Sequence, residues 1–264
     1  MLSSLRKVIT EVLDRVGGPK ASLCLDFDGT LAAIAPEPSE ARLDQSVRQA
    51  LLAIQETDRI MVGVISGRAI EDLTHRVGID GLVYAGNHGL EILGNGLRFV
   101  EPDALLAKDE LRQTVKELVA SLWPIPGIRI EDKRLTAAVH YRLAADSQLP
   151  KIWAAVNQAV SPYASRLHVR SGKKSIEITP RTGWNKGSAV CWINRRFGIP
   201  PRSSVYVGDD TTDEDAFVAL KGGVTIKVGP SRQTHAHYSL KDPGEVQELL
   251  EYIARGHEAG NSRQ

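Results

Sequence analysis

The stretch Ala21–Pro38, ASLCLDFDGTLAAIAPEP, decides how the rest of the chain is interpreted. Its apolar run Leu23–Leu25 predicts a buried strand. Asp26 and Asp28 follow directly, and two like charges this close repel and are costly to bury unless a cation or hydrogen-bond donors compensate. Gly29 lets the backbone turn sharply and approach a ligand. The pattern favours a divalent cation beside a nucleophilic carboxylate over a plain turn capped by aspartates.

The composition limits what the protein does. In 264 residues, Lys and Arg (33) nearly balance Asp and Glu (32), so no electrostatic case exists for nucleic acid or an anionic membrane. No apolar run approaches the roughly 18 residues of a membrane span. Residues 2–18 have the spacing of an amphipathic helix rather than a signal peptide. Cys24 and Cys191 are predicted to be buried thiols without a disulfide. We therefore expect a soluble cytoplasmic protein with no nucleic-acid or membrane partner.

Strands and helices alternate along the first hundred residues. A helix is predicted over 46–57, a continuously apolar strand over 59–66 and a helix over 69–77. Such a strand is typical of a parallel sheet covered by helices on both faces. Ser66, Gly67 and Arg68 lie where this strand meets the next helix. A hydroxyl and unpaired amides there suit a phosphate, although Ser66 also fits a plain helix N-cap.

The next predicted strand, within residues 81–91, breaks into Gly86-Asn87-His88-Gly89. A loop histidine commonly bonds its own backbone. Ligands of open α/β sheets, however, bind at the carboxyl ends of the strands. We therefore expect Asn87 and His88 to line a cleft.

The alternation stops near residue 102. We predict helices over 103–123 and 148–160 and strands over 128–133, 135–143, 167–170 and 175–179. This block indicates an inserted α+β domain over 103–179, with residues 1–102 and 180–264 forming the other domain.

The strands of the inserted block alternate between apolar and polar residues, so one sheet face should pack on the two helices. The polar residues predicted on the opposite face are Glu131, Lys133, His140, Arg142, Arg170 and Glu177. A solvated polar face is the alternative interpretation.

The chain then returns to the first domain. A helix is predicted over 188–197, with Lys186 in its first turn, where the helix dipole disfavours a positive charge. A strand over 203–208 leads into Asp209, Asp210 and Asp213. Thr212 and Asp215 are expected to form a capping box for a helix over 216–220. Two adjacent aspartates at the strand end exceed what a cap needs. A last strand over 224–228 and a helix over 244–255 complete the prediction.

These motifs carry a family resemblance. The Asp-x-Asp-Gly-Thr run after a hydrophobic strand resembles the nucleophile motif of the haloacid dehalogenase (HAD) superfamily of phosphohydrolases. The Asn-His-Gly stretch and the segments 131–133, 140–142, 172–173 and 177–180 resemble the trehalose-6-phosphate phosphatase family within it. The resemblance implies an α/β fold, with a Rossmann-like HAD core whose mostly parallel sheet is flanked by helices. It also implies an inserted α+β cap domain of the C2 type.

The resemblance also implies site roles. Asp26 would be the nucleophile that becomes an aspartyl-phosphate, and Asp28 the acid and base. Ser66 and Lys186 would hold the phosphoryl group. Mg²⁺ would be held by Asp26, the Asp28 carbonyl and Asp209, with Asp210 and Asp213 behind them or bonded through water. The expected substrate-binding residues are Gly67, Arg68, Asn87, His88, Glu131, Lys133, His140, Arg142, Arg170, Lys173 and Glu177.

The implied substrate is a small sugar phosphate, trehalose 6-phosphate, and a trehalose-6-phosphate synthase of the same pathway is a partner candidate. Related HAD phosphatases act on sucrose phosphate, mannosyl-phosphoglycerate or glucosylglycerol phosphate, and the core motifs do not exclude them. A sugar-phosphate mutase shares the aspartate pair but carries a different, helical cap. A sensor that binds a sugar phosphate without turnover is the alternative from another functional class.

Overall fold

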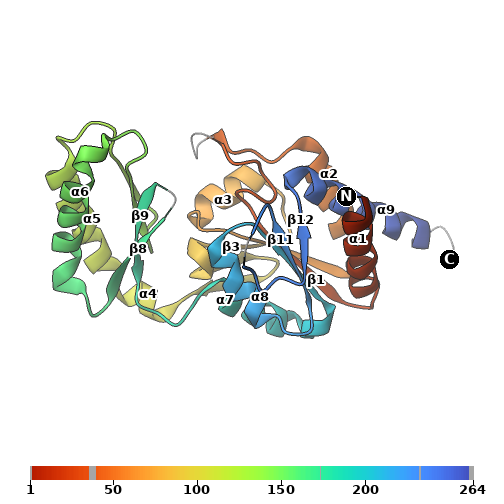
Figure 1. Ribbon diagram of the computed structural model, residues 1–264. Coiled ribbons are helices and arrows are strands. Elements are labelled where there is room, and N and C mark those ends of the chain that lie inside the picture. The colour runs from red at the N-terminus through yellow and green to blue at the C-terminus, as the bar shows by residue number, and fades with distance from the viewer. Residues whose placement is uncertain (1, 36–39, 173, 232, 262–264) are drawn as a thin grey trace. The chain divides into compact units, whose positions relative to one another are not determined.

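The computed structural model describes residues 2–35, 40–172, 174–231 and 233–261 (Figure 1). The chain divides into two compact units. Unit 1 comprises Met1–Phe99 and Trp184–Gln264, and unit 2 comprises Val100–Gly183. Unit 2 is therefore an insertion into unit 1, and its interpretation as a cap domain stays a prediction.

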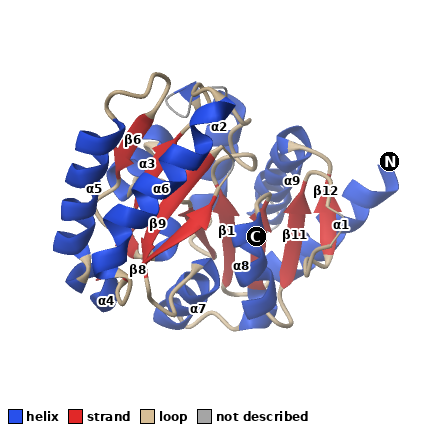
Figure 2. Ribbon diagram, turned by 60° about the vertical axis from the view of Figure 1, so that its left-hand side comes forward, coloured by secondary structure: helices blue, strands red, loops and turns tan. Residues whose placement is uncertain are grey.

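Unit 1 is built on an eight-stranded sheet with the strand order β12-β11-β10-β1-β2-β3-β4-β5 among the described residues. The strands are β1 Ala21–Asp26, β2 Ile60–Ile65, β3 Val83–Gly86, β4 Glu91–Gly94, β5 Leu97–Val100, β10 Ser204–Gly208, β11 Val224–Val228 and β12 Tyr238–Leu240. All pairs from β12 to β3 are parallel, and β3 pairs with β4 antiparallel. The arrowheads of β1, β11 and β12 accordingly point the same way in Figure 2. The mostly parallel sheet confirms the predicted fold class.

Helices cover both faces of this sheet. One face packs on α1 Leu2–Val16, α2 Gln45–Gln55, α3 Ile70–Val77 and α9 Pro243–Asn261, and the other on α7 Lys186–Phe197 and α8 Glu214–Ala219. Strand β1 shows why its sequence is continuously apolar. Leu23 and Leu25 join the first core, whereas Cys24 joins the second, because successive strand side chains point to opposite faces.

Unit 2 contains a four-stranded antiparallel sheet with the order β6-β7-β9-β8. Its strands are β6 Arg129–Asp132, β7 Ala137–His140, β8 Leu167–Ser171 and β9 Ser175–Pro180. Helices α5 Lys108–Leu122 and α6 Leu149–Val160 lie side by side against this sheet (Figure 1). Leu118 and Val156 from the helices share a core with Val139 and Ile178 from the strands. The polar residues of the strands are left on the opposite face, as the alternation predicted.

Several element predictions were wrong. The single helix over 103–123 is two helices, α4 Pro102–Leu106 and α5, which meet at Ala107. Ala107 is buried in the core of unit 2, and neither glycine nor proline occupies this break between the helices. The strand over 224–228 is not the last one, because the short β12 follows it.

The hairpin of β4 and β5 was also missed. Its turn contains Gly94, Asn95 and Gly96, all with positive φ. Gly-Asn-Gly between apolar residues is a recognised turn signal, so this hairpin could have been predicted from the sequence.

The cysteine prediction holds in part. Both cysteines are free, but only Cys24 is buried, and Cys191 is partly exposed. Burial, with a smaller contribution from Cys191, raises the pKa of Cys24 to about 12. The Cys24 thiol is therefore unreactive at neutral pH.

Among the helices of the described ranges, none combines the length and the apolar character that crossing a bilayer requires.

The packing of unit 2 predicts a contrast between two neighbouring residues of α5. Leu118 is completely buried, whereas Val119 is 44% exposed. Leu118→Ala should lower the stability of unit 2 by about 2–5 kcal/mol because it removes buried methyl groups and leaves a cavity. Val119→Ala should cost less than about 0.5 kcal/mol. Hydrogen exchange of unit 2 amides measures both, and equal losses would contradict the described burial.

Candidate active site

The carboxyl ends of the central parallel strands meet at one edge of the unit 1 sheet. Asp26 is the last residue of β1, Ser66 follows β2, and Asp209 follows β10. Residues 25 and 207 are register partners, as are residues 26 and 65. The topology therefore brings together residues that are about 180 positions apart in the chain.

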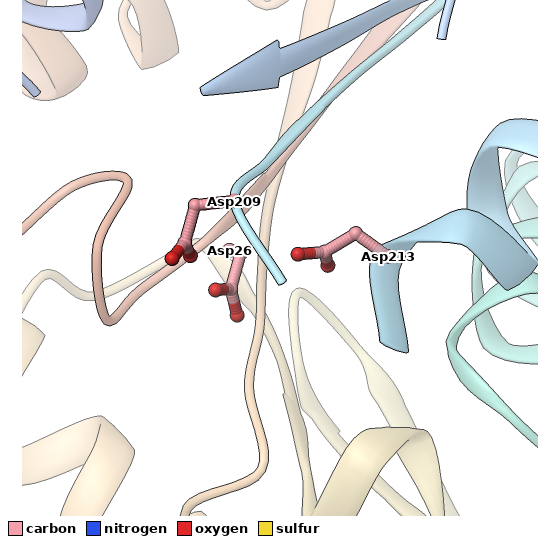
Figure 3. A group of neighbouring side chains, drawn as sticks. All are labelled: Asp26, Asp209 and Asp213. Carbon is pink, nitrogen blue, oxygen red and sulfur yellow. The ribbon is translucent and has the colours of Figure 1, made fainter. Parts of the chain in front are cut away.

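Three carboxylates converge at this edge (Figure 3). One oxygen each from Asp26, Asp209 and Asp213 lies within 4.8 Å of the others. The backbone of Gly29 passes directly over Asp209, with a φ of +82°. A Cβ atom at Gly29 would lie only 2.2 Å from Asp209 Oδ2. Only glycine fits here, which explains its place in the motif.

Lys186 lies between two of these carboxylates. Its Nζ donates to Asp26 Oδ1 at 2.9 Å and to Asp213 Oδ1 at 2.7 Å. Burial opposes the charge of the lysine, but Asp213 and Asp26 outweigh that effect and raise the pKa of Lys186 above its usual range. The lysine is therefore a permanent cation at the base of the site. Asn185 accepts from Ser188 N at 2.9 Å and begins α7, which places Lys186 in the first turn as predicted.

The carboxylates remain poorly compensated. Burial raises the pKa of Asp26 well above its ordinary value. Lys186 opposes that shift, and Asp213 and Asp209 add to it. Burial followed by the charge of Asp213 also raises the pKa of Asp209. Since oxygen donors in excess of positive charge are what Mg²⁺ prefers, the donor set at this edge fits a divalent cation.

Asp213 differs from the other two carboxylates because both of its oxygens already accept hydrogen bonds. Oδ1 accepts from Lys186 and from the Tyr206 hydroxyl at 2.7 Å, and Oδ2 accepts from Asp210 N at 2.8 Å. This supports the interpretation that Asp213 lies behind the metal ligands rather than among them.

Asp210 acts as a capping residue. It caps the short turn Thr211–Asp213 by accepting from Thr211 N at 2.7 Å, and it forms a capping box with Asp213. The predicted box between Thr212 and Asp215 is wrong. Of the two adjacent aspartates, only Asp209 is left without a capping role, because Asp210 is itself a cap.

Asp28 is held by Arg68. Its Oδ1 accepts from Arg68 Nη2 at 2.6 Å and its Oδ2 accepts from Nε at 2.7 Å. Arg68 also donates to Asp72 at 2.7 Å and lies 5.3 Å from the centroid of the Phe27 ring. The predicted substrate contact of Arg68 is thus accompanied by a bidentate contact to the proposed acid and base.

Ser66 and its neighbours lie close to this pair. The Ser66 hydroxyl accepts from Arg68 N at 3.2 Å. The alternative that Ser66 is the N-cap of α3 is wrong, because Ala69 occupies that position. A Cβ atom at Gly67 would lie 2.5 Å from the His88 ring, so Gly67 and His88 adjoin each other.

Asn87 does not line a cleft in this structure, contrary to the prediction. It is completely buried and donates to Glu91 at 2.7 Å. Asn87 and His88 both have positive φ values, near 50° and 59°. The loop is held in this left-handed conformation from inside the protein, and only His88 keeps partial exposure.

The polar face of unit 2 is an array of paired side chains. The register aligns Ala138 with Glu131 and Glu177, and Arg170 with Glu177, so these residues share one face. His140 Nε2 lies 2.8 Å from Glu131, and Lys133 Nζ lies 3.6 Å from Glu177. Burial acts to raise the pKa of Glu131, but the His140 hydrogen bond and the charge of Lys133 prevail and lower it.

One of the expected residues in unit 2, Arg142, is not part of this array. Arg142 lies in the exposed turn after β7, so it does not extend the strand face. Lys173 lies outside the described residues.

The sequence analysis missed three residues that support the site. Tyr206 bonds Asp213, Lys227 Nζ donates to the Asp209 carbonyl, and Trp184 Nε1 donates to the Gly89 carbonyl at 2.7 Å. Of these three residues, only Lys227 could have been predicted from the sequence, because a lysine within the apolar strand VTIKV is buried and requires a partner. In the sequence, Tyr206 and Trp184 look like ordinary core aromatic residues, and nothing in the local pattern indicates their polar contacts.

Comparison with known proteins shows which family the chain belongs to. Residues 24–244 match the family model "Trehalose-phosphatase". The chain is 37% identical over 271 residues to a trehalose-phosphate phosphatase of Mycobacterium avium, with 98% of this chain and 68% of the relative covered. It is 38% identical over 239 residues to that of Mycobacterium tuberculosis H37Rv, covering 87% and 60%. The chain thus spans between about three fifths and two thirds of these relatives.

Solved structures have the same fold. A trehalose-6-phosphate phosphatase related protein superimposes with a TM-score of 0.80 at 25% identity, covering 92% of this chain and 100% of that one. A haloacid dehalogenase-like hydrolase from Bacteroides thetaiotaomicron gives 0.63 at 17% identity, covering 89% and 99%. The chain shares the fold of this haloacid dehalogenase-like hydrolase, with a cluster of carboxylates at one edge of its sheet. The chain belongs to the trehalose-phosphatase family, and this membership places it among the phosphomonoesterase hydrolases.

The raised pKa values predict a pH dependence of stability in chelator. Unfolded aspartates titrate near pH 4, whereas folded Asp26 and Asp209 hold their protons to higher pH. The folded state then binds more protons, so their contribution to the free energy of unfolding falls as pH rises above about 4. Asp209→Asn should therefore gain stability relative to wild type between pH 5 and pH 8.

Thermal unfolding in EDTA across this range measures the effect. Adding Mg²⁺ should raise the Tm of wild type more than that of Asp209→Asn, because the cation relieves the same repulsion. The exposed Asp80→Asn serves as the control and should follow wild type. A Tm difference between wild type and Asp209→Asn that is independent of both pH and Mg²⁺ would contradict the described electrostatics.

Proposed function

We propose that this chain hydrolyses trehalose 6-phosphate to trehalose and phosphate in a Mg²⁺-dependent reaction with an aspartyl-phosphate intermediate. The observation that carries the proposal is the buried Asp26 carboxylate, bonded to Lys186 and adjacent to Asp209 at the carboxyl edge of the sheet. The names of the mycobacterial relatives support the substrate.

Asp26 is the nucleophile in this proposal. Its carboxylate oxygen forms a bond to phosphorus while the bond from phosphorus to the sugar oxygen breaks, and Asp28 gives the leaving oxygen a proton. Water then attacks the phosphorus of the acyl phosphate while Asp28 takes a proton from this water. The bond between the Asp26 oxygen and phosphorus breaks, which releases phosphate and restores the Asp26 carboxylate. Lys186 keeps Asp26 in place, and with Ser66 at the neighbouring strand end it stabilises the charge that develops on the phosphoryl oxygens.

The residues that would hold Mg²⁺ are Asp26, Asp209 and the backbone carbonyl of Asp28. When bound, the cation supplies positive charge that stabilises the phosphoryl group in the transition state. Asp213 and Lys227 support the ligands, through Lys186 and through the Asp209 carbonyl respectively.

Arg68 fixes the orientation of the Asp28 carboxylate. Its two hydrogen bonds to Asp28 require both oxygens to accept, which suits the carboxylate that receives a proton from water. To donate a proton in the first step, Asp28 has to give up one of these bonds. Asp72 holds Arg68 in place while this happens, because it accepts from another nitrogen of the same guanidinium.

The polar face of unit 2 is proposed to bind the sugar. A disaccharide offers many hydroxyls that need both donors and acceptors, and the pairs Glu131–His140 and Lys133–Glu177 supply both. The same face distinguishes trehalose 6-phosphate from other sugar phosphates, since the core residues contact only phosphate and metal. The synthase partner and the cytoplasmic location stay predictions.

The nucleophile assignment predicts that Asp26→Asn abolishes turnover because the amide cannot form the acyl phosphate. Release of phosphate from trehalose 6-phosphate is measured with Mg²⁺, and again in EDTA, where wild type should also be inactive. Circular dichroism shows whether Asp26→Asn is folded. Asp210→Asn, a cap residue on the same loop, should retain activity. Turnover by folded Asp26→Asn at the wild-type rate is the result that rules out this mechanism.

The sugar assignment predicts selective losses. Glu131→Ala and Glu177→Ala should each lower kcat/KM for trehalose 6-phosphate by about 10- to 100-fold, since a hydrogen bond from a charged group contributes roughly 1.5–3 kcal/mol. Turnover of an aryl phosphate should change little, because it offers no sugar hydroxyls.

Glu117→Ala, on the exposed side of α5 in the same unit, is the matched control and should leave both substrates unaffected. Equal losses on both substrates would instead assign Glu131 and Glu177 to the stability of unit 2. No loss on either substrate would support the alternative interpretation, in which this face is a solvated surface without a role in binding.

A further inference from the structure

Tyr206 is a buried polar group that the proposed mechanism does not use. It lies in the middle of β10, is completely buried, and pairs in register with Cys24 and Thr225. Its neighbours Val205 and Val207 point to the opposite face of the sheet. The Tyr206 ring packs edge-on against Phe217, with centroids 5.8 Å apart. A phenylalanine would fill this position equally well, so the hydroxyl calls for a separate explanation.

The hydroxyl has one described partner, Asp213 Oδ1, to which it donates at 2.7 Å. Lys186 Nζ donates to the same oxygen at 2.7 Å, and Asp210 N donates to Oδ2 at 2.8 Å. Both oxygens of this completely buried carboxylate therefore accept hydrogen bonds. The Asp213 side chain cannot rotate without losing a buried hydrogen bond.

Lys186 is shared between Asp213 and Asp26, at 2.7 and 2.9 Å. Which carboxylate attracts the ammonium more strongly decides where Nζ lies relative to the phosphoryl group on Asp26. A hydroxyl that donates to Asp213 Oδ1 takes up part of the negative charge there and weakens the pull of Asp213 on Lys186. The competition between the two carboxylates then shifts towards Asp26.

We propose that Tyr206 is a positioning residue for phosphoryl transfer: its hydroxyl fixes Asp213 and thereby keeps the Lys186 ammonium directed at Asp26 and the phosphoryl oxygens. This inference rests on the proposed role of Lys186 as a phosphate-binding group. Among the described residues, no hydrogen bond links Tyr206 to Asp26 or Asp209, so its hydroxyl acts through Asp213 and Lys186.

The test is Tyr206→Phe, which keeps the ring and removes only the hydroxyl. We expect kcat to fall about tenfold on both trehalose 6-phosphate and an aryl phosphate, since the loss of one hydrogen bond to a charged group acts on the shared phosphoryl step. KM for trehalose 6-phosphate should change less than about threefold, because the sugar contacts are intact.

Tyr84→Phe is the matched control. Tyr84 lies on β3 of the same sheet, is also buried, and donates its hydroxyl to the Ile79 carbonyl at 2.6 Å. Removing this hydroxyl should lower the Tm to a similar extent and leave kcat at the wild-type value. If Tyr84→Phe and Tyr206→Phe lower kcat equally, the effect is general loosening of the sheet and the proposal is overturned.

Binding of inorganic phosphate provides a readout that does not depend on turnover. Calorimetry with Mg²⁺ present should show about tenfold weaker phosphate binding for Tyr206→Phe than for wild type. In an Asp213→Asn background the same change should have no further effect, because the hydroxyl acts through that carboxylate. Additive losses would overturn the proposal, as would a wild-type kcat in Tyr206→Phe.

The proposed function and the role of Tyr206 are overturned by different results. Wild type that binds phosphate but hydrolyses no phosphate ester would end the proposed function, while the phosphate titrations would still decide the role of Tyr206. Wild type that is active, with Tyr206→Phe equally active, would end the inference and leave the proposed function intact.

Discussion

The Lys186 ammonium, buried between Asp26 and Asp213, is the interaction on which the site depends. Without this cation, three carboxylates within 4.8 Å of one another would stay close with little to offset their repulsion. The strand β10, the capping turn after it and helix α7 all contribute groups that keep the lysine in place. The stability of this sheet edge and the proposed chemistry therefore rest on the same contacts.

A single lysine leaves the cluster deficient in positive charge, and the proposed reaction makes use of this deficit. Burial raises the pKa values of Asp26 and Asp209, which shows that neither carboxylate is fully compensated. A protein selected only for stability would replace such a group, because breaking up buried like charges lowers the free energy of the folded state. Its retention is explained if a divalent cation and a phosphate complete the arrangement.

The two units divide recognition between them in the proposed function. Unit 1 presents groups suited to phosphate and metal, and unit 2 presents paired acids and bases suited to hydroxyls. The pairs on unit 2 also contact one another, so their charges are partly compensated before a ligand binds. Substrate hydroxyls would replace these contacts, so each replacement would contribute only a modest binding free energy. Specificity would therefore depend on several pairs together.

The sequence alone determined the parallel sheet, the polar face of unit 2 and the residues Asp26, Asp209 and Lys186, because these follow from local periodicity and from motifs at strand ends. Only the tertiary structure decided which carboxylates meet Lys186, that Asp210 is a cap, that Asn87 is buried and that Arg68 holds Asp28. The bend at Ala107 and the contact of Tyr206 with Asp213 likewise have no local signal. The physical reason is that partners of buried polar groups are chosen by packing between distant segments, which spacing along the chain does not encode.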